Sequence, residues 1–408
     1  MNPLAVALAW AGSGAVSAVL FPRWRRRRLG VITPLAGLIA VLVTGAGAAT
    51  GFGHLDRVAA GLLALSAASM TVAFLLAPTI RGVEALTIGL TGGAVVVALS
   101  SNSLALRSLA LLTAVGAIAL RWVTAAPGRG TLAAGRVPGG GTAALLAAAV
   151  FLPLPASATG PRPAVVGILL ASGMAALIAL LPLGGWAAAG FAALRGIDIA
   201  PWQLSLAPAA LLIAAATPQS LPDLAATMYG QLLLAAGLLT AVWSGLMAVR
   251  TAPTTRYGRV FIADLGLAAA AIGSGSTTLA LAGALLVVIT HLTLAPLLLT
   301  AAEGRVRPAH HAAWALLSGV PPSPSFWARF LLVEALVQAD PATLFAAVPA
   351  LAALFIAAVL AALPTRAGDP GASAGHSVAR DLAGWVIVAT ALAVGLVPEA
   401  AASFVFGS

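Results

Sequence analysis

A few ionisable side chains lie inside long apolar stretches of this sequence, where a charge is costly and usually serves a function. They are His291, Arg329, Asp264, Glu334 and Arg107. Histidine changes its protonation near neutral pH, so His291 could relay or gate a proton. Arginine stays protonated, so Arg329 would act on nearby water or acids through its charge alone. These residue types indicate a path for protons or cations.

Each of these residues also has a structural interpretation. His291 could be a hydrogen-bonded structural histidine. Arg329 could form a buried ion pair with Asp264 or Glu334, although Glu334 lies five residues further on, about 140° round the same helix. Asp264 could cap its helix or face the cytoplasmic mouth of a path. Arg107 could extend its charge to the membrane surface at the external end of its span.

Two apolar segments that contain prolines must position these groups. The segment Trp314–Gln338 is interrupted near its middle by Gly319 and by prolines that include Pro321 and Pro322. The segment from Val165 to about Leu194 is interrupted at Pro182, Gly184 and Gly185. Proline lacks an N–H and clashes with the preceding turn, so each helix must break there. The alternative is a kinked helix whose arginine pairs with a neighbour.

The composition identifies the environment of these segments. The 408 residues are 61% hydrophobic and only 8% charged, and the mean hydropathy is +1.05. Apolar runs long enough to cross a bilayer recur along the chain, which predicts an all-α polytopic membrane protein of about 14 transmembrane helices. The chain has no cysteine, which excludes thiolate and iron–sulfur sites. All of its 21 basic residues are arginines, which excludes a lysine relay.

The arginines also predict the topology. They are concentrated in alternate loops, beginning with the Arg23–Arg28 run after a first span at Pro3–Phe21. This bias predicts a multi-pass protein of the bacterial inner membrane with both termini outside. We expect a Gly/Pro/Arg loop at 123–141, a sixth span near 142–157 and a polar loop at 365–377.

The two broken segments are five spans apart, a spacing typical of inverted-repeat transporters. We therefore expect a single transmembrane domain over 1–408, with four parts. These are N-terminal helices at 1–80, a first repeat at 82–217 (helices 4–8), a second repeat at 228–364 (helices 9–13) and a C-terminal helix at 378–408.

Several motifs resemble the antiporter-like membrane subunits of respiratory complex I, Mrp antiporters and membrane-bound hydrogenases. The segment Ser318–Phe330, with its Gly-Val-Pro-Pro and Phe-Trp-Ala-Arg, is similar to the family's twelfth-helix motif. Pro182–Trp186, Thr254–Asp264 and Thr290–Pro296 resemble three further family motifs in the same order. The resemblance covers most of the chain, from about the fourth span to the thirteenth.

The sequence also departs from the family pattern. The resemblance places the family's fifth-span glutamate near Leu112 and its seventh-span lysine near Leu177. It places the eleventh-span lysine at Ala295, the twelfth-span lysine at Arg329 and a histidine at Gly184. Most of the family's proton relay is therefore absent.

The resemblance implies a subunit whose partners are other membrane subunits of a complex I-like or hydrogenase-like assembly, together with lipids. Because the relay is incomplete, we expect a degenerate module that acts mainly as a scaffold or moves protons weakly. Two alternatives are a functional proton or Na⁺ translocator that uses His291 and Arg329, and an independent solute permease. We expect no redox chemistry, cofactor, bound metal or nucleic acid in this chain.

Overall fold

The computed structural model describes residues 3–20, 32–39, 57–77, 82–151, 161–275, 278–301, 308–363 and 378–398. All regular elements in these ranges are helices. Eight helices in this described part are long and apolar enough to cross a membrane. The prediction of an all-helical, multi-pass membrane protein is therefore confirmed. The Arg23–Arg28 run, most of the expected second span and the expected polar loop at 365–377 lie outside the described residues.

The helices follow one another along the whole described chain. In the first part they are α1 (Pro3–Leu20), a short segment at 32–39, α4 (Arg57–Leu76), α5 (Gly82–Ser100), α6 (Leu104–Ala125) and α7 (Arg129–Phe151). In the middle they are α8 (Pro161–Ile178), α9 (Gly185–Ala193), α10 (Gly196–Pro201), the π-helix η1 (Trp202–Leu206), α11 (Ala207–Ala216) and the 3₁₀-helix η2 (Thr217–Ser220). In the last part they are α12 (Asp223–Arg250), α13 (Pro253–Gly273), α14 (Thr278–Ala301), α15 (Pro308–Leu317), α16 (Pro324–Ala339), the 3₁₀-helix η3 (Pro341–Thr343), α17 (Leu344–Ala362) and α18 (Val378–Leu396).

Small residues allow several of these helices to pack closely, as is common in membrane bundles. A Cβ added at Gly14 of α1 would lie 2.7 Å from the carbonyl oxygen of Ala85 in α5. A Cβ added at Gly237 of α12 would lie 2.6 Å from the carbonyl oxygen of Gly266 in α13. At both crossings the backbones therefore approach to a distance that only glycine permits.

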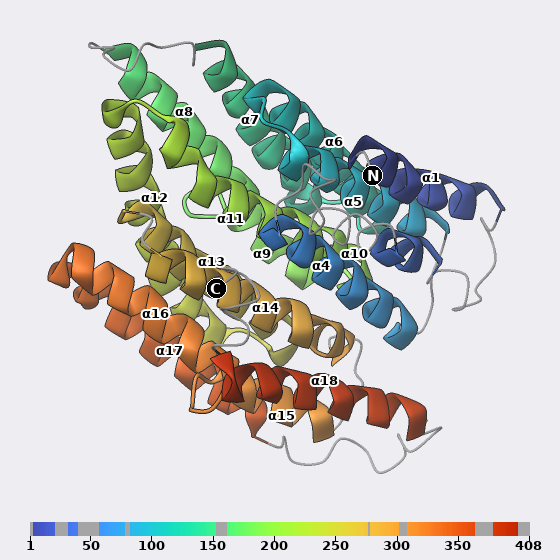
Figure 1. Ribbon diagram of the computed structural model, residues 1–408. Coiled ribbons are helices and arrows are strands. Elements are labelled where there is room, and N and C mark those ends of the chain that lie inside the picture. Colours follow the sequence, from blue (N-terminus) through green and yellow to red (C-terminus); the bar gives the residue numbers. More distant parts are fainter. Residues whose placement is uncertain are drawn as a thin grey trace.

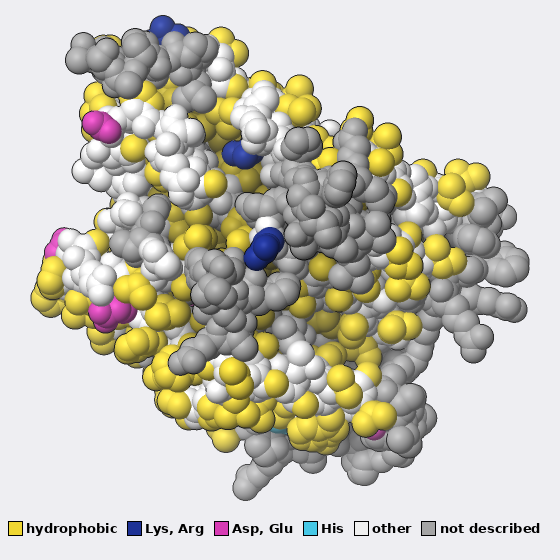
Figure 2. Space-filling view, in the orientation of Figure 1, with side chains coloured by type: hydrophobic (Ala, Val, Ile, Leu, Met, Phe, Trp, Pro, Cys, Tyr) yellow, Lys and Arg dark blue, Asp and Glu magenta, His cyan; other side chains and the backbone are white. Residues whose placement is uncertain are grey.

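The bundle has a buried centre flanked by two outer edges (Figure 1). Helices α6, α7 and α8 lie along one edge, and α16 and α17 lie along the opposite edge. Between them, α13 contacts α9, α14 and α16, and α4 contacts both α14 and η1. Hydrophobic side chains cover much of the described surface seen in Figure 2, as expected for a face in contact with lipid.

Helix α7 corrects one prediction. We expected a loop at 123–141, but α7 begins at Arg129 and continues through Pro138. A proline removes only one backbone hydrogen bond, and membrane helices tolerate such a loss when neighbouring groups compensate for it. The Gly/Pro/Arg composition of this stretch therefore does not end the helix.

Candidate functional site

The break between α15 and α16 is stabilised by an arginine. Helix α15 ends at Leu317, whose carbonyl would normally accept from the N–H of residue 321, which here is a proline. Nη1 of Arg329 donates to this carbonyl oxygen instead, at 2.9 Å. Gly319 has a φ of +83°, and a Cβ there would lie 2.9 Å from the same Nη1. Glycine at 319 therefore leaves room for the guanidinium group.

The same arginine forms a buried ion pair with Asp264 of α13. Nε and Nη2 of Arg329 donate to Oδ1 and Oδ2 of Asp264 at 2.9 and 3.0 Å. Nε2 of His291, on α14, lies 3.0 Å from the same Oδ2. The side chains of Arg329, Asp264 and His291 are 6%, 3% and 3% exposed. Three helices thus bring a fixed cation, a carboxylate and an imidazole together away from solvent.

Hydrogen bonds extend this cluster towards the centre of the bundle. Nε2 of Gln203, in η1, donates to Oη of Tyr257 at 2.5 Å, and that Oη lies 3.4 Å from Nδ1 of His291. Because Oη accepts from Gln203, its own hydrogen can point to Nδ1, which places the imidazole proton on Nε2, facing Asp264. Oε1 of Gln203 is buried and has no hydrogen-bond partner among the described residues. We call Gln203, Tyr257, His291, Asp264 and Arg329 the polar chain.

The break between α8 and α9 is stabilised without any charge. The N–H of Leu180 bonds to Ala175, and that of Leu181 bonds to Oγ1 of Thr240, so the carbonyls of Ala176 and Leu177 lose their helical donors. Indole nitrogens replace these donors. Nε1 of Trp186 donates to the carbonyl oxygen of Ala176 at 3.2 Å, and Nε1 of Trp202 donates to that of Leu177 at 3.1 Å.

Aromatic rings fill the space between this first break and the polar chain. The ring centroids of Trp122 and Trp186 are 5.4 Å apart, and those of Trp186 and Trp202 are 5.2 Å apart. Trp202 contacts Phe261 at 5.6 Å, and Phe261 contacts His291 at 4.9 Å. Such pairs pack densely and exclude water. We call Trp122, Trp186, Trp202 and Phe261 the aromatic barrier.

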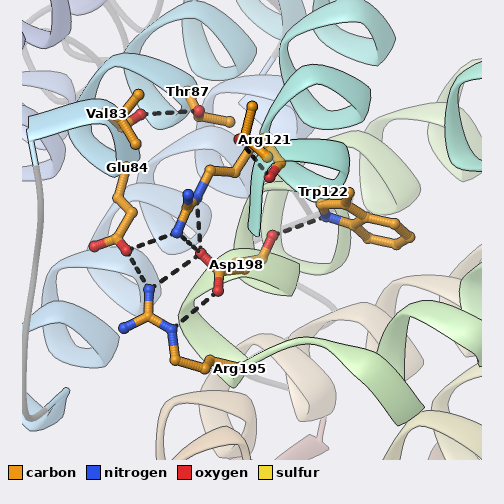
Figure 3. A network of polar contacts seen from close by, with 8 residues as sticks. Val83, Glu84, Thr87, Arg121, Trp122, Arg195 and Asp198 are labelled. Carbon is orange, nitrogen blue, oxygen red and sulfur yellow. Dashed lines mark hydrogen bonds and ion pairs between the residues drawn. The ribbon is translucent and has the colours of Figure 1, made fainter. Parts of the chain in front are cut away.

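A second ionic cluster lies at one end of this barrier (Figure 3). Nη2 of Arg121 contacts Oε1 of Glu84 at 2.9 Å and Oδ1 of Asp198 at 2.5 Å. Arg195 forms ion pairs with the same two acids, and its Nε lies 3.1 Å from Oδ2 of Asp198. Nε1 of Trp122 donates to the carbonyl oxygen of Asp198 at 2.9 Å. We call Glu84, Arg121, Arg195 and Asp198 the quartet; its two positive and two negative charges balance.

Solved structures of membrane complexes share this architecture. No protein-family model matches the sequence, and no curated protein matches it significantly. A chain of the Mrp complex from Dietzia sp. DQ12-45-1b aligns with a TM-score of 0.83 at 18% identity, over 99% of this chain and 51% of that one. A chain of respiratory complex I from Thermus thermophilus aligns with a TM-score of 0.75 at 18% identity, over 97% of both chains. The chain has the antiporter-like subunit fold.

A third structure with this fold is the membrane-bound sulfane sulfur reductase, an archaeal respiratory membrane complex. One of its chains aligns with a TM-score of 0.80 at 15% identity, over 96% of this chain and 75% of that one. The present chain therefore spans about half the length of the Mrp chain and nearly all of the complex I chain. The resemblance inferred from the twelfth-helix motif is confirmed at the level of the fold.

Within the antiporter-like fold, the expected site residues separate into two groups. The structure brings Asp264, His291 and Arg329 together. Glu334 lies further along α16, where Oε1 accepts from Nε2 of Gln338 at 2.8 Å on an exposed surface. Arg107 lies near the start of α6, where its Nε donates to the carbonyl oxygen of Ala98 at 3.2 Å. The last two residues do not contact the polar chain in the described structure.

The resemblance also assigned lysines to two positions at which this fold buries apolar side chains. Leu177 and Ala295 are both fully buried. Leu177 lies at the first break, where Trp202 donates to its carbonyl oxygen. The first break therefore contains aromatic and aliphatic groups at the position where the resemblance predicts a charge.

Sequence reasoning missed the quartet, Gln203 and Tyr257. Glu84, Arg121 and Arg195 lie near the ends of apolar runs, where charges are usually interfacial. One local signal was available, because Arg195 and Asp198 are three residues apart at the start of a helix. The other contacts of the quartet join residues that are 37 to 111 positions apart, which no local pattern reveals.

Proposed function

We propose that this protein is a membrane subunit of an energy-converting complex related to complex I and Mrp assemblies. In such a complex it serves mainly as a scaffold and translocates protons weakly or not at all. Any redox chemistry belongs to other subunits. Structural neighbours that are parts of respiratory and antiporter assemblies support the first part of this proposal.

The closed first break is the observation that supports a degenerate proton path. The break leaves two backbone carbonyls without helical donors, and a tryptophan indole N–H donates to each carbonyl oxygen, with nitrogen–oxygen distances of 3.1 and 3.2 Å. The residue at the predicted lysine position, Leu177, is fully buried. A proton needs titratable groups or ordered water to cross a bilayer, and the four side chains of the aromatic barrier carry no titratable group.

The first test is purification through a tag on this chain in a mild detergent, followed by mass spectrometry. We expect sister membrane subunits and a cofactor-bearing arm to copurify. The purified chain reconstituted into vesicles should pass protons no faster than protein-free vesicles in a pH-dye assay. A lone, monodisperse protein that transports a solute would overturn the proposal in favour of an independent permease.

The polar chain supports a second candidate, a proton translocator that works through the second half of the fold. Its hydrogen bonds run from Gln203 in η1 to Arg329 in α16, and its imidazole is positioned between Tyr257 and Asp264. Arginine keeps its proton at physiological pH, whereas histidine as a residue type can change its protonation near neutrality, so this candidate gives the proton-exchanging role to His291.

His291→Gln distinguishes the two candidates. The scaffold proposal predicts unchanged copurification and unchanged ion transport by the whole complex, because the amide nitrogen of glutamine lies near the position of Nε2 and can still donate to Asp264. The translocator proposal predicts intact assembly but loss of proton transport. His311→Gln is the matched control, because His311 lies outside the polar chain and its ring hydrogen-bonds the carbonyl oxygen of Ala362 in the described structure.

A further inference from the structure

The hydrogen bonds of the polar chain have a direction, and they begin at the amide of Gln203. Nε2 of Gln203 donates to Oη of Tyr257, this hydroxyl donates to Nδ1 of His291, and the proton on Nε2 of His291 faces Asp264. In this arrangement the imidazole is neutral. Oε1 of Gln203 is then an unused acceptor, buried and without a partner among the described residues.

A second proton on His291 is incompatible with this direction. The proton must bind to Nδ1, because Nε2 already carries one. Nδ1–H then faces Oη of Tyr257, 3.4 Å away, and the tyrosine hydroxyl can no longer donate to that nitrogen. The hydroxyl hydrogen needs another acceptor, because an unpaired buried donor is costly. Its other neighbour is Nε2 of Gln203, which is a donor and cannot accept.

The amide of Gln203 contains the missing acceptor. The terminal torsion of glutamine has two nearly equivalent orientations, so a half-turn of the amide places Oε1 where Nε2 lies. Oη of Tyr257 then accepts from Nδ1–H of His291 and donates to Oε1, and each of these groups is paired again. The same arrangement of side chains therefore supports two hydrogen-bond directions, one for each protonation state of the imidazole.

The backbone beside Gln203 is held in place by α4. In an α-helix the carbonyl of Leu204 would accept from the N–H of residue 208, which here is a proline. Oγ of Ser66 donates to this carbonyl oxygen instead, and it also lies 2.9 Å from Oγ of Ser205. The π-helix η1 is thus fixed on both sides of this contact, and the side-chain amide is the part that is free to turn.

The backbone beside His291 is held in the same way. The carbonyl of Leu292 would accept from residue 296, which is also a proline. Oγ of Ser69, one turn after Ser66 on α4, donates to this carbonyl oxygen at 2.5 Å. One helix therefore fixes the backbone next to both residues, so proton uptake is answered by hydrogen atoms and an amide rather than by a helix.

The charged groups around His291 come from two helices. Asp264 and Tyr257 of α13 contact the imidazole, and Arg329 of α16 pairs with the same aspartate. Proton uptake therefore takes this cluster from neutral to singly positive. On the other elements that pack against α14, Asp198 of α10 is held in the quartet, and the titratable groups of α4, α15 and α18 lie in the first turn of each helix. The arginines of α13 lie in its first two turns, and the second acid of α16 bonds to a glutamine.

We propose that Gln203 is an amide switch: its side-chain amide makes a half-turn when His291 takes up a proton, and the polar chain reverses its direction. The proton comes from the aqueous phase and stays on Nδ1. The free atom of Gln203 at η1 changes from an acceptor to a donor. An amide does not release a proton at physiological pH, so the chain registers a proton on His291 without passing it to the first half of the fold. The switch goes beyond the proposed function, because it operates in a scaffold and in a translocator alike.

Solid-state NMR of the purified chain in lipid nanodiscs tests the proposal. The side-chain amides of glutamine carry ¹⁵N, Cζ of tyrosine carries ¹³C, and the ring nitrogens of histidine carry ¹⁵N in a parallel sample. The label is specific, because the sequence has four glutamines and two tyrosines, and Gln203 is the buried glutamine among them. Tyr229 is an internal control, because its hydroxyl donates to the carbonyl oxygen of Ala214.

We expect a strong dipolar coupling between Nε2 of Gln203 and Cζ of Tyr257 when His291 is neutral. On lowering the pH, this coupling should weaken by roughly twofold or more, because it falls with the cube of the distance and the half-turn moves Nε2 out of hydrogen-bond range. The change should follow the same titration curve as the ring nitrogens of His291.

Two variants connect the rotation to the imidazole. His291→Asn keeps a polar atom near Nδ1, facing Tyr257, but does not titrate, and it adds no labelled glutamine. We expect its coupling to stay strong at every pH. His311→Asn is the matched control and should behave as wild type, because His311 bonds to the carbonyl oxygen of Ala362 outside the polar chain.

Three results would overturn the inference. They are a coupling that stays constant while His291 titrates, a pH-dependent coupling that persists in His291→Asn, and an imidazole that keeps one protonation state wherever the protein remains folded. These measurements use the purified chain, so they do not depend on whether sister subunits copurify. The switch and the proposed function can therefore fail separately.

Discussion

The two helix breaks of this protein meet the same backbone requirement in different ways. Each break removes helical donors from carbonyls in an apolar environment, where an unpaired polar group is costly. The first break uses two indole N–H groups, from Trp186 and Trp202. The second uses the guanidinium of Arg329, which in turn requires Asp264 as its counter-ion.

The difference separates an aromatic break from a polar break. Neutral indoles need no counter-ion, so the first break can be packed with rings and kept dry. A guanidinium cannot be buried alone, so the second break retains an aspartate and, through it, a histidine and a tyrosine. The polar chain can therefore be understood as a consequence of how one break is stabilised, whether or not it conducts protons.

The largest effect is expected from restoring a charge to the first break. Leu177→Lys would place a buried ammonium group beside Trp202, and the carboxylates of the quartet, Glu84 and Asp198, are already paired with arginines. Burying an unpaired ion costs several kcal/mol, so folded protein should be nearly absent from fluorescence-detected size-exclusion chromatography. Arg329→Lys is the control, since Asp264 can still pair with it. Normal accumulation of Leu177→Lys would mean that the first half is hydrated, and the contrast between the halves would be lost.

Removing the arginine of the second break should have the next largest effect. Arg329→Met leaves Asp264 charged and the Leu317 carbonyl without a donor, which should destabilise the protein by about 3–5 kcal/mol. Thermal unfolding in detergent measures the change. The double variant Asp264→Leu with Arg329→Met removes both charges and should recover most of the loss. If the double variant is as unstable as the single one, the instability of Arg329→Met does not come from leaving Asp264 without its counter-ion.

A smaller effect is expected from deleting one indole donor. Trp202→Phe keeps most of the ring but leaves the carbonyl of Leu177 unpaired, at a cost of about 1–3 kcal/mol. The same thermal assay applies, with Trp243→Phe as the matched control because Trp243 is 49% exposed on α12. Equal stability of Trp202→Phe and wild type would show that water or another donor satisfies this carbonyl.

The sequence predicted the parts of the site that depend on local chemistry. Proline disfavours a continuous helix, so Pro182 and Pro321 indicated both breaks, whereas Pro138 and Pro296 are accommodated inside α7 and α14. The cost of a buried charge predicted a partner for Arg329 and left Asp264 and Glu334 open. Helix geometry disfavoured Glu334, and the structure places Asp264 against the arginine.

The remaining features depend on how distant segments pack. Tyr257 lies beside Arg256 and Arg259, and clustered arginines usually indicate a loop at the membrane surface. Its ring is nevertheless buried, and its hydroxyl contacts η1 and α14. Tryptophans near span ends usually indicate membrane anchors, so nothing local marks Trp186 and Trp202 as donors to a broken helix. Such roles are set by which carbonyls lose their partners, and that follows only from the folded backbone.

The smallest effect concerns the residue that ends the helix before each break. Ala179 follows α8 with a φ of +67°, whereas the corresponding left-handed residue after α15 is Gly319, at +83°. A left-handed conformation costs a residue with a Cβ roughly 1–2 kcal/mol, and glycine avoids this cost. Ala179→Gly should therefore stabilise the protein by about 1 kcal/mol in the thermal assay. Gly319→Ala should destabilise it by more than this, because the added Cβ also contacts Nη1 of Arg329. Loss of stability in Ala179→Gly would show that packing of the alanine methyl group offsets the cost of its left-handed conformation. The two breaks would then differ in the residue type that their left-handed position requires, as well as in the groups that donate to their carbonyls.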